Sequence, residues 1–194
     1  MKNICFIGAA GSGKSTLATE TFTELKKKNY NTEHISEFIR TDIQAHGPME
    51  SIWEQYRVRF SQKEIEDNLP KNVDYAIIDS GTLTQYFYAC LYCDHTNARQ
   101  RLVMSDMYKY WLDDIYLKRY SYVFWLPSGE THRANPELLN DGTRYQNQQE
   151  IDLLDTHMEL MFNRLHKGVG NIYTIDGPLH KRIERVLDVI GIPR

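Results

Sequence analysis

Short apolar runs alternate along the chain with longer segments in which apolar residues recur every three or four positions. The short runs predict strands buried on both faces, over residues 2–7, 32–36, 73–79, 121–126 and 171–175. The longer segments predict helices over residues 16–25, 49–68, 82–91, 99–118, 151–167 and 178–190. Because strands and helices alternate, we expect an α/β fold in which a parallel five-stranded sheet is covered by helices on both faces.

Two segments carry more specific expectations. Residues 49–68 indicate an amphipathic helix, because four apolar residues recur at helical spacing: Ile52, Tyr56, Phe60 and Ile65. Residues 130–149 are polar and contain Pro136 and Gly142, so they follow neither pattern. A long loop inside a compact domain is usually functional, and we expect a lid segment over about residues 128–149.

The stretch between the first strand and the first helix matches the phosphate-binding pattern G-x-x-x-x-G-K-[ST], in the context that this pattern requires. Its glycines let the backbone approach an anion, and the helix start adds N–H groups and the positive end of the helix dipole. We expect a P-loop NTPase fold in which Lys14 reaches the β- and γ-phosphates of ATP and Ser15 binds Mg²⁺. A glycine-rich turn without a phosphate role is the alternative, but such a turn needs neither Lys14 nor Ser15. The expected nucleotide-binding residues are Gly8, Ala9, Ala10, Gly11, Ser12, Gly13, Lys14, Ser15 and Thr16.

Ligands of parallel sheets bind at the carboxyl ends of the strands, and candidate residues follow several predicted strands. Asp79 ends a long apolar run, where a carboxylate can hold Mg²⁺ or its water; the alternative is a cap of the following turn. Glu37 follows the second strand and can accept the proton of an attacking hydroxyl. Arg40 can bind the acceptor, although Glu37 and Arg40 could instead form a structural salt bridge.

The predicted lid contains Asp141-Gly142-Thr143-Arg144. An arginine that closes onto a transferring phosphoryl group adds positive charge where negative charge develops. We therefore expect Arg144 to be catalytic together with Lys14, Glu37 and Asp79. A solvated loop arginine is the alternative.

Composition narrows the class of protein. The 194 residues suffice for one sizeable core, so we expect a single domain over residues 1–194. A net charge of −3 does not favour nucleic acid as a partner, although Arg57, Arg59 and Lys63 could form a basic strip between glutamates. The three cysteines are typical of reduced core residues. No apolar run approaches the roughly 18 residues of a membrane span, so we expect a cytoplasmic protein without a membrane partner.

Three stretches resemble the P-loop kinase domain of the bacterial NAD regulator and its relatives, which phosphorylates nicotinamide riboside. They are Glu37-Phe38-Ile39-Arg40, residues 75–87 and Asp141-Gly142-x-Arg144, in the family's order and with similar spacing over nearly the whole chain. The resemblance implies an ATP-dependent kinase of a small hydroxyl compound, with Glu37 and Arg40 near the acceptor and Arg144 near the ATP phosphates. Where that family has a second aspartate after the strand end, this chain has Gly81. Compact stand-alone members of the group also occur in bacteriophages, some acting on modified nucleotides or DNA bases, so the acceptor stays open.

Three functions are therefore compared. The favoured one is an ATP- and Mg²⁺-dependent kinase that phosphorylates a nucleoside, nucleotide or riboside. The second is a kinase of nucleic acid or of a modified base in DNA. The third is a P-loop ATPase that switches a protein partner; a GTPase is disfavoured because the chain has no Asn-Lys-x-Asp-like guanine motif.

Overall fold

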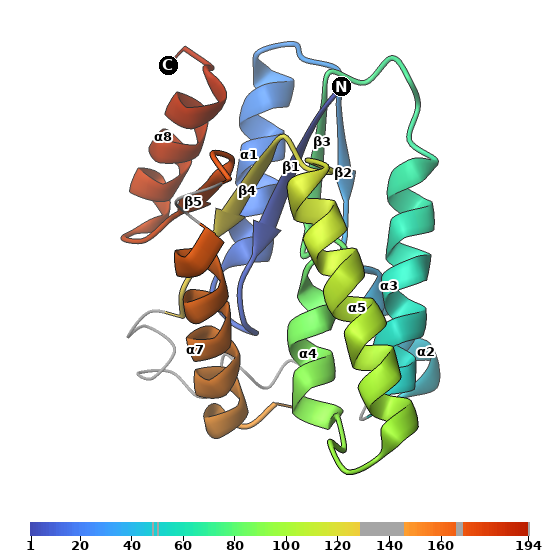
Figure 1. Cartoon of the computed structure of the whole chain (residues 1–194). Coiled ribbons are helices and arrows are strands. Elements are labelled where there is room, and N and C mark those ends of the chain that lie inside the picture. Colours follow the sequence, from blue (N-terminus) through green and yellow to red (C-terminus); the bar gives the residue numbers. More distant parts are fainter. Residues whose placement is uncertain (48, 50, 129–145, 166–168, 194) are drawn as a thin grey trace.

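The strands form one sheet in which every neighbouring pair is parallel (Figure 1). The structure is a computed structural model that describes residues 1–47, 49, 51–128, 146–165 and 169–193. The order of the strands across the sheet is β2-β3-β1-β4-β5, which confirms the expected five-stranded parallel sheet. Their bounds are β1 Lys2–Ile7, β2 Thr32–Ile35, β3 Tyr75–Asp79, β4 Tyr122–Trp125 and β5 Ile172–Thr174.

The helices lie close to the predicted segments, with one addition. The addition is α2 (Phe38–His46), which directly follows β2 and ends at Gly47, whose φ of 89° takes the chain out of the helix. Its nine residues make only about two and a half turns, so the helical repeat has little length in which to stand out in the sequence. The others are α1 Lys14–Lys27, α3 Ile52–Asp67, α4 Thr84–Tyr92, α5 Ala98–Tyr116, α7 Gln148–Leu165 and α8 Leu179–Ile190.

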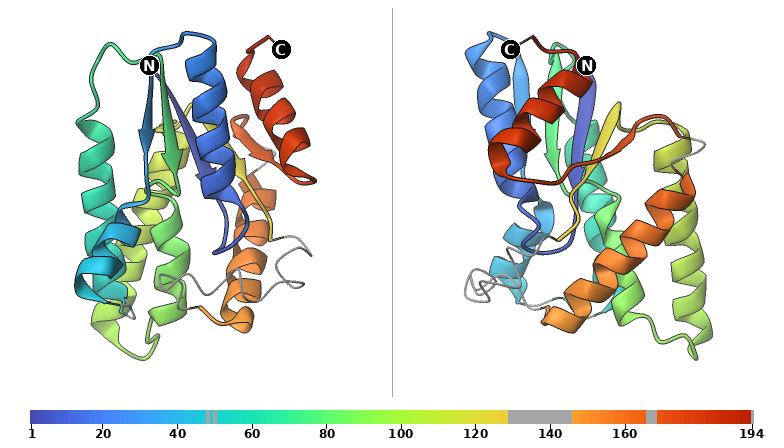
Figure 2. Two further views of the ribbon diagram at one scale, coloured as in Figure 1. Left: turned by 180° about the vertical axis from the view of Figure 1, so that it is seen from behind. Right: turned by 90° about the vertical axis from the view of Figure 1, so that its left-hand side faces the viewer.

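Helices cover both faces of the sheet because side chains alternate along each strand. In β1, Ile4 and Phe6 pack with apolar residues of α1 and α8. Cys5 and Ile7 point to the other face and pack with residues of α4, α5 and α7. Figure 2, left, shows α1 and α8 together on the face turned away from the viewer in Figure 1. A sheet covered on both faces leaves its strand ends as the place for a ligand.

The prediction that α3 buries an apolar face is wrong in part. Ile52 is buried, but Phe60 and Ile65 remain 38% and 41% exposed. The helix instead buries polar residues along its contact with the core: Gln55, Arg59, Gln62 and Glu66. Arg59, Gln62 and Glu66 form hydrogen bonds in the interior, and Gln55 lines a cavity. Burial of this face therefore does not require apolar residues.

The proposed basic strip on α3 is dispersed. Arg59 is 2% exposed and pairs with Asp114 at 2.6 Å, whereas Arg57 pairs with Asp42. Lys63 pairs with Asp67. These three cations are each engaged by a carboxylate, so they do not form the strip of unpaired positive charge that nucleic acid binding needs.

None of the helices in the described segments is long and apolar enough to cross a membrane. The segment expected to form a lid lies mostly at residues 129–145, outside the described residues.

Candidate functional site

The phosphate loop joins β1 to α1 and has the backbone that its glycines permit. Gly11 and Gly13 have φ values of 82° and 89°, in the left-handed region that favours glycine. A Cβ at Gly8 would lie 2.5 Å from the Leu126 carbonyl oxygen and 2.5 Å from Ser12 Oγ, so a side chain does not fit there. Gly13 precedes α1 directly, and the first N–H groups of that helix have no carbonyl partner within it. The loop can therefore present N–H groups to an anion.

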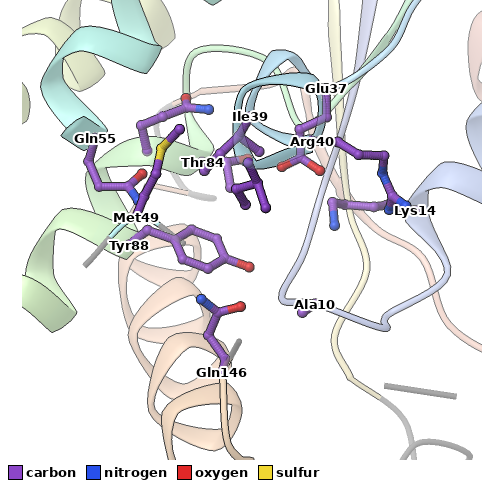
Figure 3. Close-up of a pocket in the computed structure, with 12 residues that line it drawn as sticks. Ala10, Lys14, Glu37, Ile39, Arg40, Met49, Gln55, Thr84, Tyr88 and Gln146 are labelled. Atoms are coloured by element: carbon purple, nitrogen blue, oxygen red, sulfur yellow. The ribbon is translucent and has the colours of Figure 1, made fainter. Parts of the chain in front are cut away.

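Lys14 is the first residue of α1 and extends into a cavity next to the loop (Figure 3). Lys14 is only 7% exposed, and its ammonium group forms no hydrogen bond or ion pair with the described residues. A buried cation that no carboxylate contacts is unfavourable unless a ligand supplies the opposite charge. Lys14 is therefore suited to bind an anion such as a phosphate group.

Asp79 is the last residue of β3 and pairs with Phe6 of β1. Phe6 lies two residues before the phosphate loop, which begins at Gly8. Asp79 is 5% exposed, and its Oδ1 has no hydrogen-bond partner. A buried carboxylate oxygen without a donor is uncommon and suits a bound cation. Oδ1 does not cap the following turn, the alternative role, because no donor reaches it.

The residues present fit Mg²⁺. Within the described segments, no three or more His, Cys, Asp or Glu side chains are grouped to hold a metal ion by themselves. Mg²⁺ in nucleotide sites is usually held by one or two protein oxygens together with phosphates and water. Asp79, with its unpartnered oxygen, and the hydroxyl of Ser15 at the start of α1 are the groups that would hold it.

A strained turn fixes the backbone after Asp79. Ser80 and Gly81 have φ values of 69° and 53°. The next residue, Thr82, donates its N–H to Tyr120 Oη at 2.7 Å and its hydroxyl to Asp114 Oδ2 at 2.7 Å. Tyr120 in turn donates to Glu66 Oε2 at 3.0 Å. Buried hydrogen bonds from two other segments thus hold the turn that follows Asp79, and Glu66 in turn holds Tyr120.

Gly81 is where the chain departs from the aspartate of the resembled family. A Cβ at this position would lie 2.7 Å from Cys5 Sγ and 2.7 Å from Tyr120 Oη. Position 81 therefore points into the core rather than toward a ligand. In this backbone the glycine reflects a packing requirement and does not alter the surface of the cavity.

Glu37 lies just before α2 and borders the same cavity as Lys14 (Figure 3). Burial raises the pKa of the Glu37 carboxyl, the positive charge of Lys14 opposes this, and the negative charge of Asp79 adds to the rise. A glutamate with a raised pKa is a better proton acceptor near neutral pH than an ordinary one. Arg40, one turn into α2, also lines the cavity at this end. The structure thus brings Lys14, Glu37 and Arg40 together.

The cavity continues away from the loop between α2, α3 and α4. It measures about 660 Å³, including space open to solvent. Two glutamines line this part, Gln55 of α3 and Gln85 of α4; each is 1% exposed, and each has a side-chain oxygen without a partner. Other lining residues there are Ile39, Ile43, Met49, Thr84, Tyr88 and Gln146.

Sequence reasoning missed this part of the site. A glutamine inside a helical pattern carries no signal of its own, and the two glutamines are 30 positions apart in the chain. Only the packing of α3 against α4 brings their carboxamides to one cavity. Arg144, the remaining predicted site residue, lies outside the described residues.

The loop between β1 and α1, the parallel sheet and the residues at its carboxyl edge define a P-loop NTPase fold. The profile of the AAA domain family matches residues 3–175, and the chain belongs to that family. A search of curated proteins returned no match.

Solved structures support the fold. The NadR protein in complex with NR superposes with a TM-score of 0.72 at 19% identity, over 100% of this chain and 53% of that one. Deoxyadenosine kinase from M. mycoides, with dCMP and a flexible dCDP bound, gives a TM-score of 0.66 at 14% identity, over 97% and 98% of the two chains. The same enzyme with dATP gives 0.63 at 15% identity, over 97% and 99%. The resemblance to the kinase domain of the NAD regulator is confirmed as a likeness of fold, and this chain spans about half the length of the NadR chain.

Proposed function

We propose that the chain is an ATP- and Mg²⁺-dependent kinase that transfers the γ-phosphoryl group of ATP to a hydroxyl of a nucleoside-like acceptor. One observation carries the proposal: a single cavity extends from the phosphate loop at Ala10 and Lys14, past Glu37 and Arg40, to the carboxamides of Gln55 and Gln85. A phosphate site and a site for a second small molecule thus adjoin, with a carboxylate between them. The whole chain would act as one kinase domain over residues 1–194.

The reaction forms a bond between the acceptor oxygen and the γ-phosphorus while the bond from that phosphorus to ADP breaks. Glu37 accepts the proton of the acceptor hydroxyl, a role that suits its raised pKa. Lys14 and the loop N–H groups bind the β- and γ-phosphates and stabilise the charge that develops there. Ser15 and Asp79 would hold Mg²⁺, which would supply positive charge to offset part of the negative charge on the phosphates. Arg144 is proposed to add a further positive charge over the phosphates.

The lining of the cavity favours an uncharged ring over a second phosphate at its far end. Ile43, Met49 and Tyr88 offer apolar contacts for a flat ring, and Gln55 and Gln85 offer amide groups for the polar edge of that ring. Unpaired buried amides discriminate strongly between ring edges, because a wrong ligand leaves them without partners. The M. mycoides enzyme of similar fold is named a deoxyadenosine kinase, and its bound ligands are deoxynucleotides, which agrees with a nucleoside-like acceptor. Arg40 lies where it can contact a ribose or a 5′ group, so ribosides and nucleotides remain acceptors to test.

The test is a panel of acceptors incubated with ATP and Mg²⁺: nucleosides, deoxynucleosides, nicotinamide riboside, nucleoside monophosphates and short DNA. We expect a phosphorylated small molecule, measured by chromatography and ³¹P NMR. Lys14→Ala should lower kcat by roughly a hundredfold or more, the size of one lost preorganised charge. Gln55→Leu should lower kcat/KM for the acceptor by about tenfold and leave KM for ATP unchanged, since one hydrogen bond of about 1.4 kcal/mol corresponds to tenfold.

Gln44→Leu is the matched control, because Gln44 is exposed on α2 and does not line the cavity. It should behave as wild type. Transfer to DNA alone would favour the nucleic acid kinase. The absence of any acceptor, or equal acceptor kinetics for Gln55→Leu and Gln44→Leu, would contradict the proposed function.

A further inference from the structure

One arginine of α8 bonds to the phosphate loop across 170 positions of sequence. Arg182 Nη1 donates to the backbone oxygen of Ser12 at 2.8 Å, and Arg182 Nε donates to the backbone oxygen of Gly177 at 2.6 Å. A Cβ at Gly13 would lie 3.3 Å from Arg182 Nη1, so the guanidinium covers the loop at this glycine. The guanidinium therefore connects the loop after β5 to the loop after β1.

The peptide bond that Arg182 contacts joins Ser12 to Gly13. The described part of the chain contains no cis peptide bond, so the carbonyl of Ser12 and the N–H of Gly13 point in opposite directions from one plane. When Arg182 holds the carbonyl on its own side, the N–H must point to the other side. Gly11 and Gly13 flank Ser12, and glycines rotate easily, so this peptide would otherwise be free to change its orientation.

We propose that Arg182 is a positioning residue for nucleotide binding: it holds the Ser12 carbonyl outward and thereby directs the Gly13 N–H toward the phosphates. The inference rests on the proposed function only in that the loop must bind phosphate. Arg182 acts through the loop and not through contact with the nucleoside. A lysine cannot replace it fully, because only the planar guanidinium offers Nε and Nη donors at a fixed spacing for the two carbonyls.

The surroundings of Arg182 agree with this role. Burial lowers the pKa of the guanidinium, and the nearby Asp176 opposes that shift. Arginine nevertheless stays protonated in proteins, so both donors are always present. Hydrogen bonds from a charged donor are roughly twice as strong as those between neutral groups, and the carbonyl of Ser12 accepts such a bond.

The test measures binding of inorganic triphosphate and of ATP by calorimetry, which requires no acceptor and no turnover. Arg182→Ala and Arg182→Lys should each raise the Kd for both ligands, by about tenfold or more for Arg182→Ala. Acceptor KM at saturating ATP should stay unchanged. The control is Arg185→Ala, which removes the same charge from an exposed position of the same helix and should alter Kd by less than twofold.

A second measurement follows the Ser12–Gly13 peptide directly by NMR. In ¹⁵N-labelled wild type, the Gly13 amide signal should move on addition of triphosphate; in Arg182→Ala that movement should be much smaller. If Arg182→Ala does not fold, Arg182→Met, which keeps most of the side-chain volume but cannot donate to either carbonyl, takes its place with the same expected results. Triphosphate affinities equal to those of Arg185→Ala would overturn the proposal, as would a loss confined to ATP, which would mean direct contact with the nucleoside. Wild type that fails to bind triphosphate would overturn the proposed function as well.

Discussion

Glu37 and Asp79 are two carboxylates of one site with different surroundings. Asp79 is buried at a strand end with an unpartnered oxygen, whereas Glu37 borders the cavity next to Lys14. Burial raises the pKa of Glu37, and Asp79 contributes to this through its negative charge. Two neighbouring carboxylates separate their roles most readily when one is neutralised by a metal ion and the other exchanges a proton.

This separation predicts different effects of removing each charge. Glu37→Gln should lower kcat by roughly a hundredfold to ten-thousandfold, the range of a lost general base, while KM for ATP barely changes. Asp79→Asn should instead raise the Mg²⁺ concentration needed for half-maximal activity. Initial rates over a Mg²⁺ series measure both effects. An identical Mg²⁺ dependence in the two variants would contradict the assignment.

Glu37 also predicts how activity should depend on pH. Since the pKa of Glu37 is raised, its active carboxylate is lost on acidification at a higher pH than for an ordinary glutamate. The kcat/KM of wild type should therefore fall as pH falls through this raised value, and Glu37→Gln should lack that decline. The profile is measured at saturating Mg²⁺, so that metal binding does not limit the rate.

At the scale of elements, the turn between β3 and α4 leaves no room for a side chain at one of its positions. Gly81 combines a φ of 53° with a Cβ position 2.7 Å from both Cys5 Sγ and Tyr120 Oη. Gly81→Ala should lower the free energy of unfolding by about 2 kcal/mol or more, from backbone strain and overpacking together. Urea unfolding measures this loss. Gly170→Ala is the control, since no atom lies within 4 Å of that Cβ position and its φ is not positive; it should change stability by less than about 1 kcal/mol. Equal stability of the two variants would exclude the strain.

The elements also show what the sequence could and could not predict. The strands were predictable because a strand covered on both faces must be apolar, and the phosphate loop because its glycines, lysine and serine serve one ligand. α2 was missed because it is short and follows β2 directly, and the buried face of α3 because Gln55, Arg59 and Glu66 replace apolar residues there. Contacts that join distant segments, such as Arg182 to Ser12, leave no local pattern in the chain.

At the scale of the whole molecule, the order of the sheet brings the site together. β1 lies in the middle of the sheet between β3 and β4, and β2 pairs with β3, so the phosphate loop, Asp79 and Glu37 follow adjacent strands. Parallel strands present these residues at one edge. The likeness of fold extends to solved structures of different length, since this chain covers 53% of the NadR chain and 98% of a deoxyadenosine kinase chain.

The last prediction distinguishes a kinase from an ATPase that switches a partner. A kinase must keep water from the γ-phosphate until its acceptor is bound, usually by closing a segment that completes the site. We expect slow ATP hydrolysis by the protein alone and a rise of roughly a hundredfold or more in ADP formation with the right acceptor, the size expected for one added charge donor. Arg144→Ala should remove most of that rise, whereas Arg185→Ala, which removes an exposed charge on α8, should keep it. A coupled assay of ADP release measures all four rates. Hydrolysis without acceptor on the order of 10 per second, unaffected by Arg144→Ala, would contradict the kinase and favour the ATPase, whose turnover should then respond to a protein partner.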